Sequence, residues 1–245
     1  MDVSTPATRS VCRNYLLAAL PEADFQRIAP QLTMIPMQVR QPLYSVGDEI
    51  EYVYFPNGGM VSITAVMADG TVVETATVGR EGMVGTEVCL RTSAATAWGD
   101  TMVQIPDGSA LRMTAHALRA ELTRRGELSE LLGRYTQSVI AQMMQTGACN
   151  ALHPVHERCA RWLLLAHDRV GKDEFQLSHE YLAAMLGVRR PSVSVVAGAL
   201  QAAGVISYRH GHLTILDRQG LEQAACECYV RIRAHVDQFR PAEQG

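Results

Sequence analysis

The chain has 245 residues, of which 47% are hydrophobic and 19% charged, so it is long enough for two ordinary domains with a core in each. No apolar run reaches the roughly 18 to 20 residues of a membrane-spanning helix, and the stretch MDVSTPATRSVCRN lacks the hydrophobic core of a signal peptide. We therefore expect a protein of the cytoplasm with no membrane partner. The net charge of −3 attracts no polyanion, so affinity for nucleic acid would need a local basic patch.

Six cysteines lie far apart in the sequence, except for a final Cys-Glu-Cys; they are Cys12, Cys89, Cys149, Cys159, Cys226 and Cys228. A disulfide framework would be denser and belong to a smaller secreted chain, and a four-cysteine metal or cluster site would show paired C-x-x-C spacing. The sequence therefore predicts ordinary buried thiols, with no metal and no evident cofactor. Redox sensing by a thiol stays open as the alternative.

The first part of the chain predicts short helices followed by strands. One or two helices are expected after Asn14, since LPEADF (residues 20–25) places a proline and acids at a helix start. Between residues 33 and 113 short β-branched and aromatic runs alternate with turn residues, and Asp69-Gly70 is a strong hairpin signal. The runs are EYVYF (51–55), MVSITAVM (60–67), TVVETATV (71–78) and TMVQI (101–105). Their spacing predicts an antiparallel β unit, a jelly-roll or barrel.

Residues 114–150 contain no proline and are predicted to be helical. One set of side chains in this segment repeats at alternating steps of four and three residues, close to the 3.5-residue period of paired helices. The set is Leu128, Leu132, Tyr135, Val139, Gln142, Thr146 and Cys149. We expect this face to pair two copies of the chain as a homodimer. Packing on the chain's own β unit is the alternative, because Gln142 and Thr146 make the face partly polar.

A second domain is expected from about residue 151, where His153-Pro154 ends the helical pattern. Ser178 is expected to cap a short amphipathic helix, and Gly187 to end it, because glycine adopts the left-handed conformation without strain. The next helix, about residues 189–203, buries one face at helical spacing. That face comprises Val193, Val196, Ala197 and Leu200. Two short helices joined by a glycine turn predict a compact helix-turn-helix.

Arg189 and Arg190 stand at the entry of that second helix, where the helix dipole disfavours positive charge by about 0.3 to 1 kcal/mol each. Something other than helix stability has to favour them. In a helix-turn-helix this end points into the major groove of DNA, where an arginine binds guanine O6 and N7 and backbone N–H groups hold phosphate. Pro191 is harmless in the first turn, which loses no intrahelical bond there.

A hairpin is predicted next, from VISY (205–208) and LTIL (213–216) with Gly211 in its turn. Three basic or titratable side chains cluster at its tip and make it a wing: Arg209, His210 and His212. From Gly187 to Arg218, four arginines stand against a single acid, Asp217, which leaves a charge of +3 over 32 residues. A local basic patch therefore exists in a chain that is negative overall.

The last helix is expected over about residues 218–239, where it would cover the winged unit. Cys226 and Cys228 are two residues apart on this helix and would point to different faces, which argues against a two-cysteine metal clamp. His153 and His156 lie at a helix start without a third partner, so a solvated or capping role is expected for them.

The β unit, the central helix and LGVRRPSVSVVAGALQAAGVI followed by the wing YRHGHLTILD resemble the cyclic-AMP receptor protein/fumarate-nitrate regulator (Crp-Fnr) family of bacterial transcription factors. The resemblance implies an α+β chain in three parts: an effector-binding-like jelly-roll with N-terminal helices (1–115), a dimerisation helix (116–150) and a winged helix-turn-helix (151–245). It implies a homodimer on a palindromic operator in double-stranded DNA, with RNA polymerase as a further partner.

By position, Arg190 falls where the family has its base-reading arginine, whereas Pro191 replaces a usual glutamate and Val195 a common second arginine. These departures suggest a different target sequence, and Val195 would either touch a thymine methyl or only pack. The predicted DNA-binding residues are Arg189, Arg190, Ser192, Ser194, Val195, Gly198, Arg209 and His210.

The cyclic-nucleotide pocket of the family needs a glycine-bracketed turn, a glutamate for the ribose and an arginine for the cyclic phosphate. Gly82 and Gly85 match the turn, but Thr86 takes the glutamate position and Glu87 comes one residue late, which in a strand turns a side chain to the other face. Only Arg91 is nearby, and burying a phosphate without a counter-charge is costly. We expect no cyclic-AMP binding and an unknown effector; gating by a cyclic nucleotide or another small ligand is the alternative.

Other sensing modes and functions find less support. An iron-sulfur sensor would need an N-terminal cysteine cluster, and only Cys12 is present, whereas a haem ligand stays open. A jelly-roll enzyme would need two or three histidines in the β unit, and all eight histidines lie at or after His116. No catalytic residue is therefore predicted. A protein-interaction module that has lost DNA binding is the third class, against which Arg189 and Arg190 speak.

Overall fold

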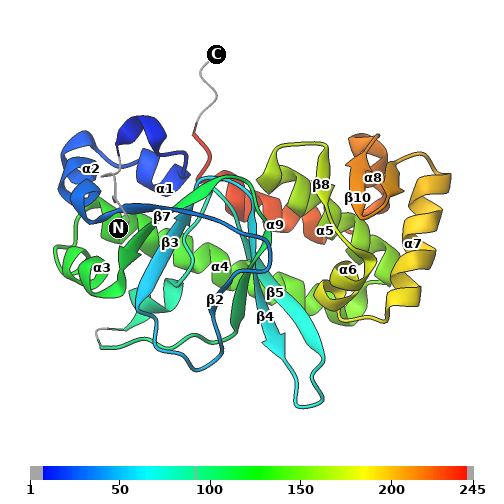
Figure 1. Cartoon of the computed structure of the whole chain (residues 1–245), viewed down its shortest axis with the longest axis horizontal. Helices are drawn as coiled ribbons and strands as arrows, with labels where there is room; N and C mark the ends of the chain where they lie inside the picture. The colour runs from blue at the N-terminus through cyan, green and yellow to red at the C-terminus, as the bar shows by residue number, and fades with distance from the viewer. Residues whose placement is uncertain (1–7, 92, 242–245) are drawn as a thin grey trace.

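The computed structural model describes residues 8–91 and 93–241 (Figure 1). Its N-terminal segment consists of short helices: η1 (Arg9–Val11), α1 (Tyr15–Ala18), α2 (Glu22–Ile28) and η2 (Ala29–Gln31). Asn14 begins α1 as expected, because its side-chain oxygen accepts a hydrogen bond from the N–H of Leu17 at 3.2 Å. Its amide group donates to the carbonyl oxygens of Pro56 (3.1 Å) and Gly82 (2.7 Å), so this fully buried residue ties the helices to the β unit.

The β unit is built from two antiparallel sheets, as the alternating runs predicted. One has the order β1 (Thr33–Pro36), β7 (Ser109–Thr114), β3 (Tyr52–Pro56), and the other β2 (Pro42–Tyr44), β6 (Asp100–Ile105), β4 (Met60–Val66), β5 (Val72–Val78). The predicted hairpin joins β4 to β5: Gly70 has φ +82°, and the Asp69 carboxylate accepts the N–H of Thr71 at 2.9 Å. A 3-10 helix, η3 (Thr86–Leu90), connects β5 to β6.

The central helical segment is interrupted, so the prediction of one continuous helix over residues 114–150 is wrong. It forms α3 (Ala115–Leu122) and the long helix α4 (Glu127–Leu152), which runs behind the sheets in Figure 1. The chain turns between them through Arg125, whose φ is +53°, and Gly126, which caps α4. The five residues from Thr123 to Glu127 are polar or glycine, and the repeating apolar face begins only after them, at Leu128.

The face of α4 that was expected to pair with a second copy packs against the chain itself, so that prediction is wrong. All seven of its side chains are buried within the single chain: Leu128, Leu132, Tyr135, Val139, Gln142, Thr146 and Cys149. The polar Gln142 finds its partners on β5, where its amide nitrogen donates to the carbonyl oxygen of Thr77 at 3.1 Å. The alternative, packing on the chain's own β unit, holds for part of this face, and the rest packs against α9 and the residues on either side of it.

The C-terminal part has its own hydrophobic core, built around the fully buried Trp162. Its elements are α5 (Val155–Val170), β8 (Glu174–Gln176), α6 (His179–Leu186), α7 (Arg190–Ala202), β9 (Ile206–Arg209), β10 (His212–Ile215), α8 (Arg218–Ala224) and α9 (Cys228–Asp237). The three strands form an antiparallel sheet in the order β8-β10-β9. In Figure 1 the elements from β8 to α8 lie on the right-hand side, with α7 at the outer edge, and α9 lies near the centre.

The last helical segment also differs from the prediction of one helix over residues 218–239. It is broken at Ala225, whose backbone is extended (φ −88°, ψ 151°), so α8 stays on the winged unit while α9 lies against α4 and α5. Beyond α9, Phe239 meets the ring of Tyr135 edge-on at 5.6 Å between centroids. Within residues 8–91 and 93–241, none of the helices combines the length and the apolar character that a bilayer crossing requires.

Candidate nucleic-acid interface

The helix-turn-helix is formed by α6 and α7, and the sequence signals that predicted it are confirmed. The Ser178 hydroxyl caps α6 by accepting the N–H of Tyr181 at 3.2 Å. Gly187 ends α6 in the left-handed conformation (φ +62°), and its N–H donates to the carbonyl oxygen of Ala184 at 3.0 Å. A Cβ on Gly187 would lie 2.9 Å from Cγ2 of Val73, so the turn rests directly on strand β5 of the β unit.

Helix α7 buries the predicted stripe and presents its opposite face to solvent. The buried side chains are Val193, Val196, Ala197 and Leu200. On the open face the side chain of Val195 is 73% exposed, and a Cβ built on Gly198 would meet nothing within 4 Å. At Val195 and Gly198 this face is therefore open to solvent, as a helix that enters a groove of DNA requires.

Both arginines at the start of α7 are exposed. Arg189 is the N-cap residue and Arg190 the first helical residue. Within residues 8–91 and 93–241, neither guanidinium forms an ion pair or a side-chain hydrogen bond with another residue of the chain. Pro191 occupies the first turn, as expected. The unfavourable placement of two cations at a helix N-terminus is thus not offset by any contact inside the described chain.

The two serines of the predicted site are less free than the arginines. Ser192 is half-buried. Ser194 is exposed, but its hydroxyl donates to the carbonyl oxygen of Arg190 at 3.3 Å and lies 3.1 Å from Nδ1 of His179. A DNA contact of Ser194 would therefore have to share a hydroxyl that already has intramolecular partners.

His179 is a member of this site that the sequence reasoning missed. Its ring packs on the ring of Tyr208 with 4.3 Å between centroids, and the Tyr208 hydroxyl donates to the carbonyl oxygen of Leu177. Burial, and next the nearby charge of Arg190, lower the pKa of His179 below its ordinary value. His179 thus connects α6, α7 and β9; its position directly after the capping Ser178 was the only signal in the sequence.

The wing is a tight hairpin between β9 and β10. Its two turn residues, His210 (φ +49°) and Gly211 (φ +81°), both have the left-handed backbone of a two-residue turn. Arg209 and His210 are exposed beside the turn, as predicted. His212 instead faces strand β8, where its Nδ1 lies 3.3 Å from a carboxylate oxygen of Glu174.

The basic patch is smaller than the sequence count indicated, because Arg218 turns inward. Its guanidinium pairs with the carboxylates of Asp168 (2.8 Å) and Glu222 (3.1 Å), so its charge is matched inside the C-terminal domain. The arginines that remain on the surface of this region are Arg189, Arg190 and Arg209. We call these three side chains the basic patch.

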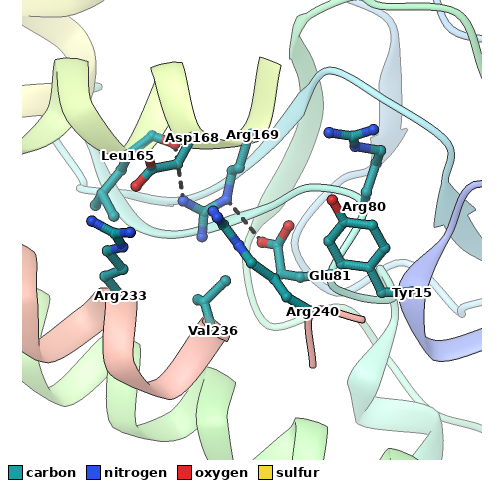
Figure 2. Close-up of a pocket in the computed structure, with 9 residues that line it drawn as sticks. All are labelled: Tyr15, Arg80, Glu81, Leu165, Asp168, Arg169, Arg233, Val236 and Arg240. Atoms are coloured by element: carbon teal, nitrogen blue, oxygen red, sulfur yellow. Dashed lines mark hydrogen bonds and ion pairs between the residues drawn. The ribbon is translucent and has the colours of Figure 1, made fainter. Parts of the chain in front are cut away.

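A buried polar cluster fixes the helix-turn-helix relative to the rest of the chain (Figure 2). Arg169, at the end of α5, pairs with the carboxylate of Glu81 at 2.9 Å, and both side chains are buried. The same guanidinium donates to the carbonyl oxygen of Thr77 (3.1 Å) and to Oε1 of Gln142 (3.3 Å). One side chain therefore joins α5 to strand β5, to α4 and to the turn after β5.

A second buried contact between the two parts is made by Glu74 of β5. Its carboxylate accepts hydrogen bonds from the Ser62 hydroxyl (2.5 Å) and from Nε1 of Trp162 on α5 (2.8 Å). Burial raises the pKa of Glu74 from 4.5 to about 7, and the two donors, Arg161 and Arg169 offset only part of this effect. The contact between α5 and the β unit thus contains buried ionisable groups.

The region expected to correspond to an effector pocket is closely packed. A Cβ on Gly82 would lie 1.9 Å from the hydroxyl oxygen of Tyr135, so this glycine serves the contact with α4. Gly85 has φ +95°, and the chain then forms the 3-10 helix η3 rather than the strand that we expected. Thr86 is buried and Glu87 half-buried. The directions of these two side chains follow from the turn of a 3-10 helix, and not from the alternation of a strand.

The charged residues of that region do not converge. One carboxylate oxygen of Glu87 accepts the backbone N–H of Trp98 at 3.3 Å. Arg91 is exposed, beyond the end of η3. The space beside the turn is filled by apolar side chains, all at most 1% exposed: Met83, Val84 and Val88.

Two antiparallel sheets, a long central helix and a winged helix-turn-helix define a two-part chain with a cyclic-nucleotide-binding-like β unit. Residues 157–224 match the Crp-like helix-turn-helix domain family. Over 61 residues the chain is 38% identical to the transcriptional regulator SdrP of Thermus thermophilus. The matched stretch is 25% of this chain, and the chain spans only about 30% of the length of SdrP. The chain therefore contains a Crp-like helix-turn-helix domain.

Solved structures extend the similarity to the whole fold. A transcriptional regulator of the crp/fnr family from Eubacterium rectale superposes with a TM-score of 0.66 at 17% identity, over 86% of this chain and 98% of the other. FixK2 from Bradyrhizobium japonicum gives a TM-score of 0.67 at 18% identity, over 80% of this chain and 98% of the other. The chain thus has the Crp/Fnr fold across both of its parts.

Proposed function

We propose that this protein is a sequence-specific DNA-binding transcription regulator whose helix α7, with the residues just before and after it (about 189–203), enters the major groove. The observation that carries the proposal is the pair Arg189 and Arg190, which are exposed at the start of a helix whose solvent face is open; their guanidinium groups form no ion pair with the described residues. The match to a Crp-like helix-turn-helix domain and the names of the relatives support it. Such a regulator acts on the chromosome, in the cytoplasm of a bacterial cell.

Within this proposal the predicted contact residues divide into two classes. Arg190 reads a guanine through O6 and N7, and Val195 meets a thymine methyl or packs on it. Arg209 and His210 on the wing contact backbone phosphate and so position the domain without reading sequence. Arg189 belongs fully to neither class. The guanidinium of Arg189 and the N-terminal amide groups of α7 bind the same phosphate.

The protein acts as a homodimer through the face of α4 that stays open. This face repeats at alternating steps of four and three residues, and all its members are exposed: Gly133, Gln137, Ile140, Met144, Gly147 and Ala151. Met144 is 72% exposed, and a Cβ on either glycine would meet nothing within 4 Å, so a second helix can approach closely. Two copies present their α7 helices to half-sites about 10 to 10.5 base pairs apart on a palindromic operator.

Regulation by cyclic AMP is not part of the proposal. Arg91 is exposed, Glu87 is engaged by the Trp98 backbone, and apolar side chains fill the space beside the turn, so the described residues of this region supply no buried counter-charge for a cyclic phosphate. Contact with RNA polymerase on the operator follows from the role of a regulator, and its surface is not assigned.

The test is selection of bound DNA from a random duplex pool with the full chain, repeated with and without cyclic AMP. We expect enrichment of one two-fold symmetric sequence, the same in both arms, and an affinity that falls steeply with salt. Enrichment of no sequence over many rounds, with weak binding at low salt, would leave the chain as a protein-interaction module. Enrichment only in the arm with cyclic AMP would restore the cyclic nucleotide as effector.

A further inference from the structure

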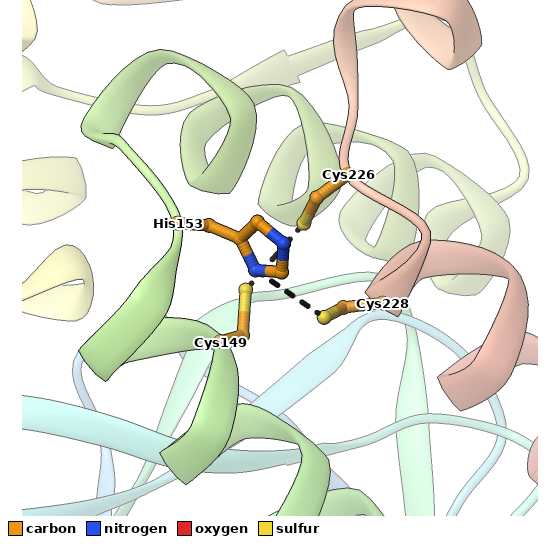
Figure 3. A group of neighbouring side chains, drawn as sticks. All are labelled: Cys149, His153, Cys226 and Cys228. Carbon is orange, nitrogen blue, oxygen red and sulfur yellow. Dashed lines mark hydrogen bonds between the residues drawn. The ribbon is translucent and has the colours of Figure 1, made fainter.

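Four side chains with metal-binding atoms converge where α4 ends and α9 begins (Figure 3). Cys149 and His153 lie one helical turn apart at the end of α4, and Cys226 and Cys228 flank the start of α9. Their sulfur and nitrogen atoms all lie within 4.8 Å of one another. All three cysteines are buried, and the side chain of His153 is 20% exposed. We call these four residues the hinge cluster.

Two of the distances in the hinge cluster are close to the edge length of a metal-ligand tetrahedron, and the others are at most 4.8 Å. The Sγ atoms of Cys149 and Cys226 are 3.5 Å apart, and Sγ of Cys228 is 3.6 Å from Nδ1 of His153. With zinc–sulfur bonds of about 2.3 Å, the edges of a tetrahedral site measure about 3.8 Å between sulfurs and slightly less between sulfur and nitrogen. A single ion at the centre thus needs only small side-chain movements.

We propose that the hinge cluster is a structural zinc site in which Cys149, Cys226 and Cys228 bind Zn²⁺ as thiolates and His153 binds it through Nδ1. Three cysteines and one histidine are a frequent ligand set of closed, four-coordinate zinc sites. The cluster supplies four protein ligands, so no position is left for water or a substrate. The site therefore holds the chain together and is not catalytic.

The surroundings of the cluster fit this role. The other ring nitrogen of His153, Nε2, lies 3.2 Å from a carboxylate oxygen of Glu227, which orients the ring and fixes the tautomer with Nδ1 toward the sulfurs. Gln145 donates from its amide nitrogen to Sγ of Cys228 at 3.0 Å. Both contacts belong to the kind of outer partner that metal-binding histidines and thiolates have in proteins.

The charge balance also favours a metal-thiolate centre. Zn²⁺ with three thiolates and a neutral imidazole carries one net negative charge, which is costly to bury alone. Two guanidinium groups of α5, those of Arg158 and Arg161, are buried in this part of the chain, and that of Arg158 lies 3.4 Å from the side-chain oxygen of Asn150, the residue after Cys149. A centre of opposite sign is thus matched by side chains already inside the protein.

A two-iron cluster and a disulfide fit the arrangement less well. A two-iron cluster divides its four ligands between two separated metal ions, whereas all four ligand atoms here lie around one point. A disulfide between Cys149 and Cys226 would account for two of the side chains only. It would leave the placement of Cys228, His153 and Glu227 without a reason.

The position of the site gives it a structural consequence. His153 and Pro154 separate α4 from α5, so they form the connection between the central helix and the helix-turn-helix domain. An ion bound there fastens the start of α9 to this connection and restricts rotation of the domain about it. The site itself does not depend on the proposed DNA binding, and its test uses no DNA.

The primary experiment measures metal in the full-length wild-type chain, purified under reducing conditions and dialysed. We expect about one zinc per chain, its release when the thiols react with a mercurial reagent, and tetrahedral cobalt-thiolate absorption after exchange with Co²⁺. Cys228→Ser and His153→Ala should lose at least about tenfold in zinc affinity. Cys12→Ser, which changes a cysteine outside the cluster, should keep the metal.

A second measurement keeps the proposal testable if the variants fold poorly. A strong chelator added to the wild-type chain under reducing conditions should lower its unfolding temperature by about 5 °C or more, and added zinc should restore it. The proposal is overturned if zinc supplied in excess leaves the chain metal-free, with the three thiols of Cys149, Cys226 and Cys228 still reactive. It is equally overturned by iron with acid-labile sulfide in the purified chain, or by a Cys149–Cys226 disulfide in peptide maps of the protein as isolated.

Discussion

Replacing Glu74 with glutamine tests the contact between the β unit and α5 that orients the helix-turn-helix. The carboxyl group of Glu74 is 7% exposed and receives hydrogen bonds from Ser62 and Trp162. A glutamine keeps both contacts, since its oxygen still accepts from Nε1 of Trp162 and its amide can donate to the Ser62 hydroxyl. The substitution therefore removes the ionisation and little else.

The size of the effect follows from the pKa of Glu74, which burial raises from 4.5 to about 7. Because the folded chain binds this proton more tightly than the unfolded chain, the stabilising contribution is fully present below about pH 4.5. It is lost as the pH rises through about 7. At about 1.36 kcal/mol for each pH unit between the two pKa values, the loss amounts to about 3 kcal/mol.

The assay is urea unfolding at several pH values between 5 and 8, followed by the fluorescence of the buried Trp162. We expect Glu74→Gln to match the wild-type free energy of unfolding near pH 5 and to exceed it by up to about 3 kcal/mol at pH 8. Glu130→Gln, which neutralises an exposed carboxylate on α4, is the control and should follow the wild-type profile. Parallel profiles for wild type and Glu74→Gln, or a less stable Glu74→Gln at pH 8, would refute the reasoning.

Three further predictions concern other contacts. In urea unfolding, Gly204→Ala should destabilise the chain by about 1 kcal/mol through the positive φ of this position alone. Gly187→Ala should destabilise it by about 1 kcal/mol more, because the new Cβ would also meet Val73. Met144→Glu should shift the protein from dimer to monomer in light scattering, while Val230→Glu, on an equally exposed apolar residue of α9, should leave the dimer intact; the opposite result would place the dimer contact elsewhere. Arg209→Ala should weaken binding to every DNA sequence alike and reduce the salt slope by about 1, and a change in sequence preference would contradict a phosphate contact.

Much of the fold could be predicted because local patterns decided it. The Asp69-Gly70 turn, the Ser178 cap and the Gly187 stop each act within a few residues, and the structure has all three. The break at Ala225 escaped prediction because apolar spacing continues across it, and the break at Gly126 because the segment was judged by its lack of proline, which does not exclude a turn. Long-range packing, and not spacing, decides where such a helix ends.

The repeating face of α4 shows that spacing alone also fails to identify the partner of a helix face. The set from Leu128 to Cys149 repeats at steps of four and three residues, which predicted pairing with a second copy. That face is buried within the single chain, against β5, η3 and α9, since a heptad-like stripe packs on elements of its own chain as well as on a partner helix. The spacing alone could not decide between these two partners, because both satisfy it.

The two candidate sites differ in whether the sequence could reveal them. Arg189 and Arg190 could be found because their position at a helix start is unfavourable for the helix itself. The hinge cluster could not, because Cys149 and Cys226 are 77 residues apart in sequence and meet only in the fold. On one continuous helix Cys226 and Cys228 would diverge; the extended backbone at Ala225 lets both face Cys149.

The central claim is that the exposed start of α7 reads base edges in DNA, and the most direct test is the affinity of Arg190→Ala for the selected operator and its single-base variants. Arg231→Ala, on an exposed arginine of α9, is the matched control. We predict that Arg190→Ala weakens binding to the selected operator by about 1 to 3 kcal/mol, or about 5- to 150-fold, and abolishes discrimination at one base pair of each half-site, while Arg231→Ala changes neither. Equal losses for both variants, with discrimination retained at every position, would contradict the account.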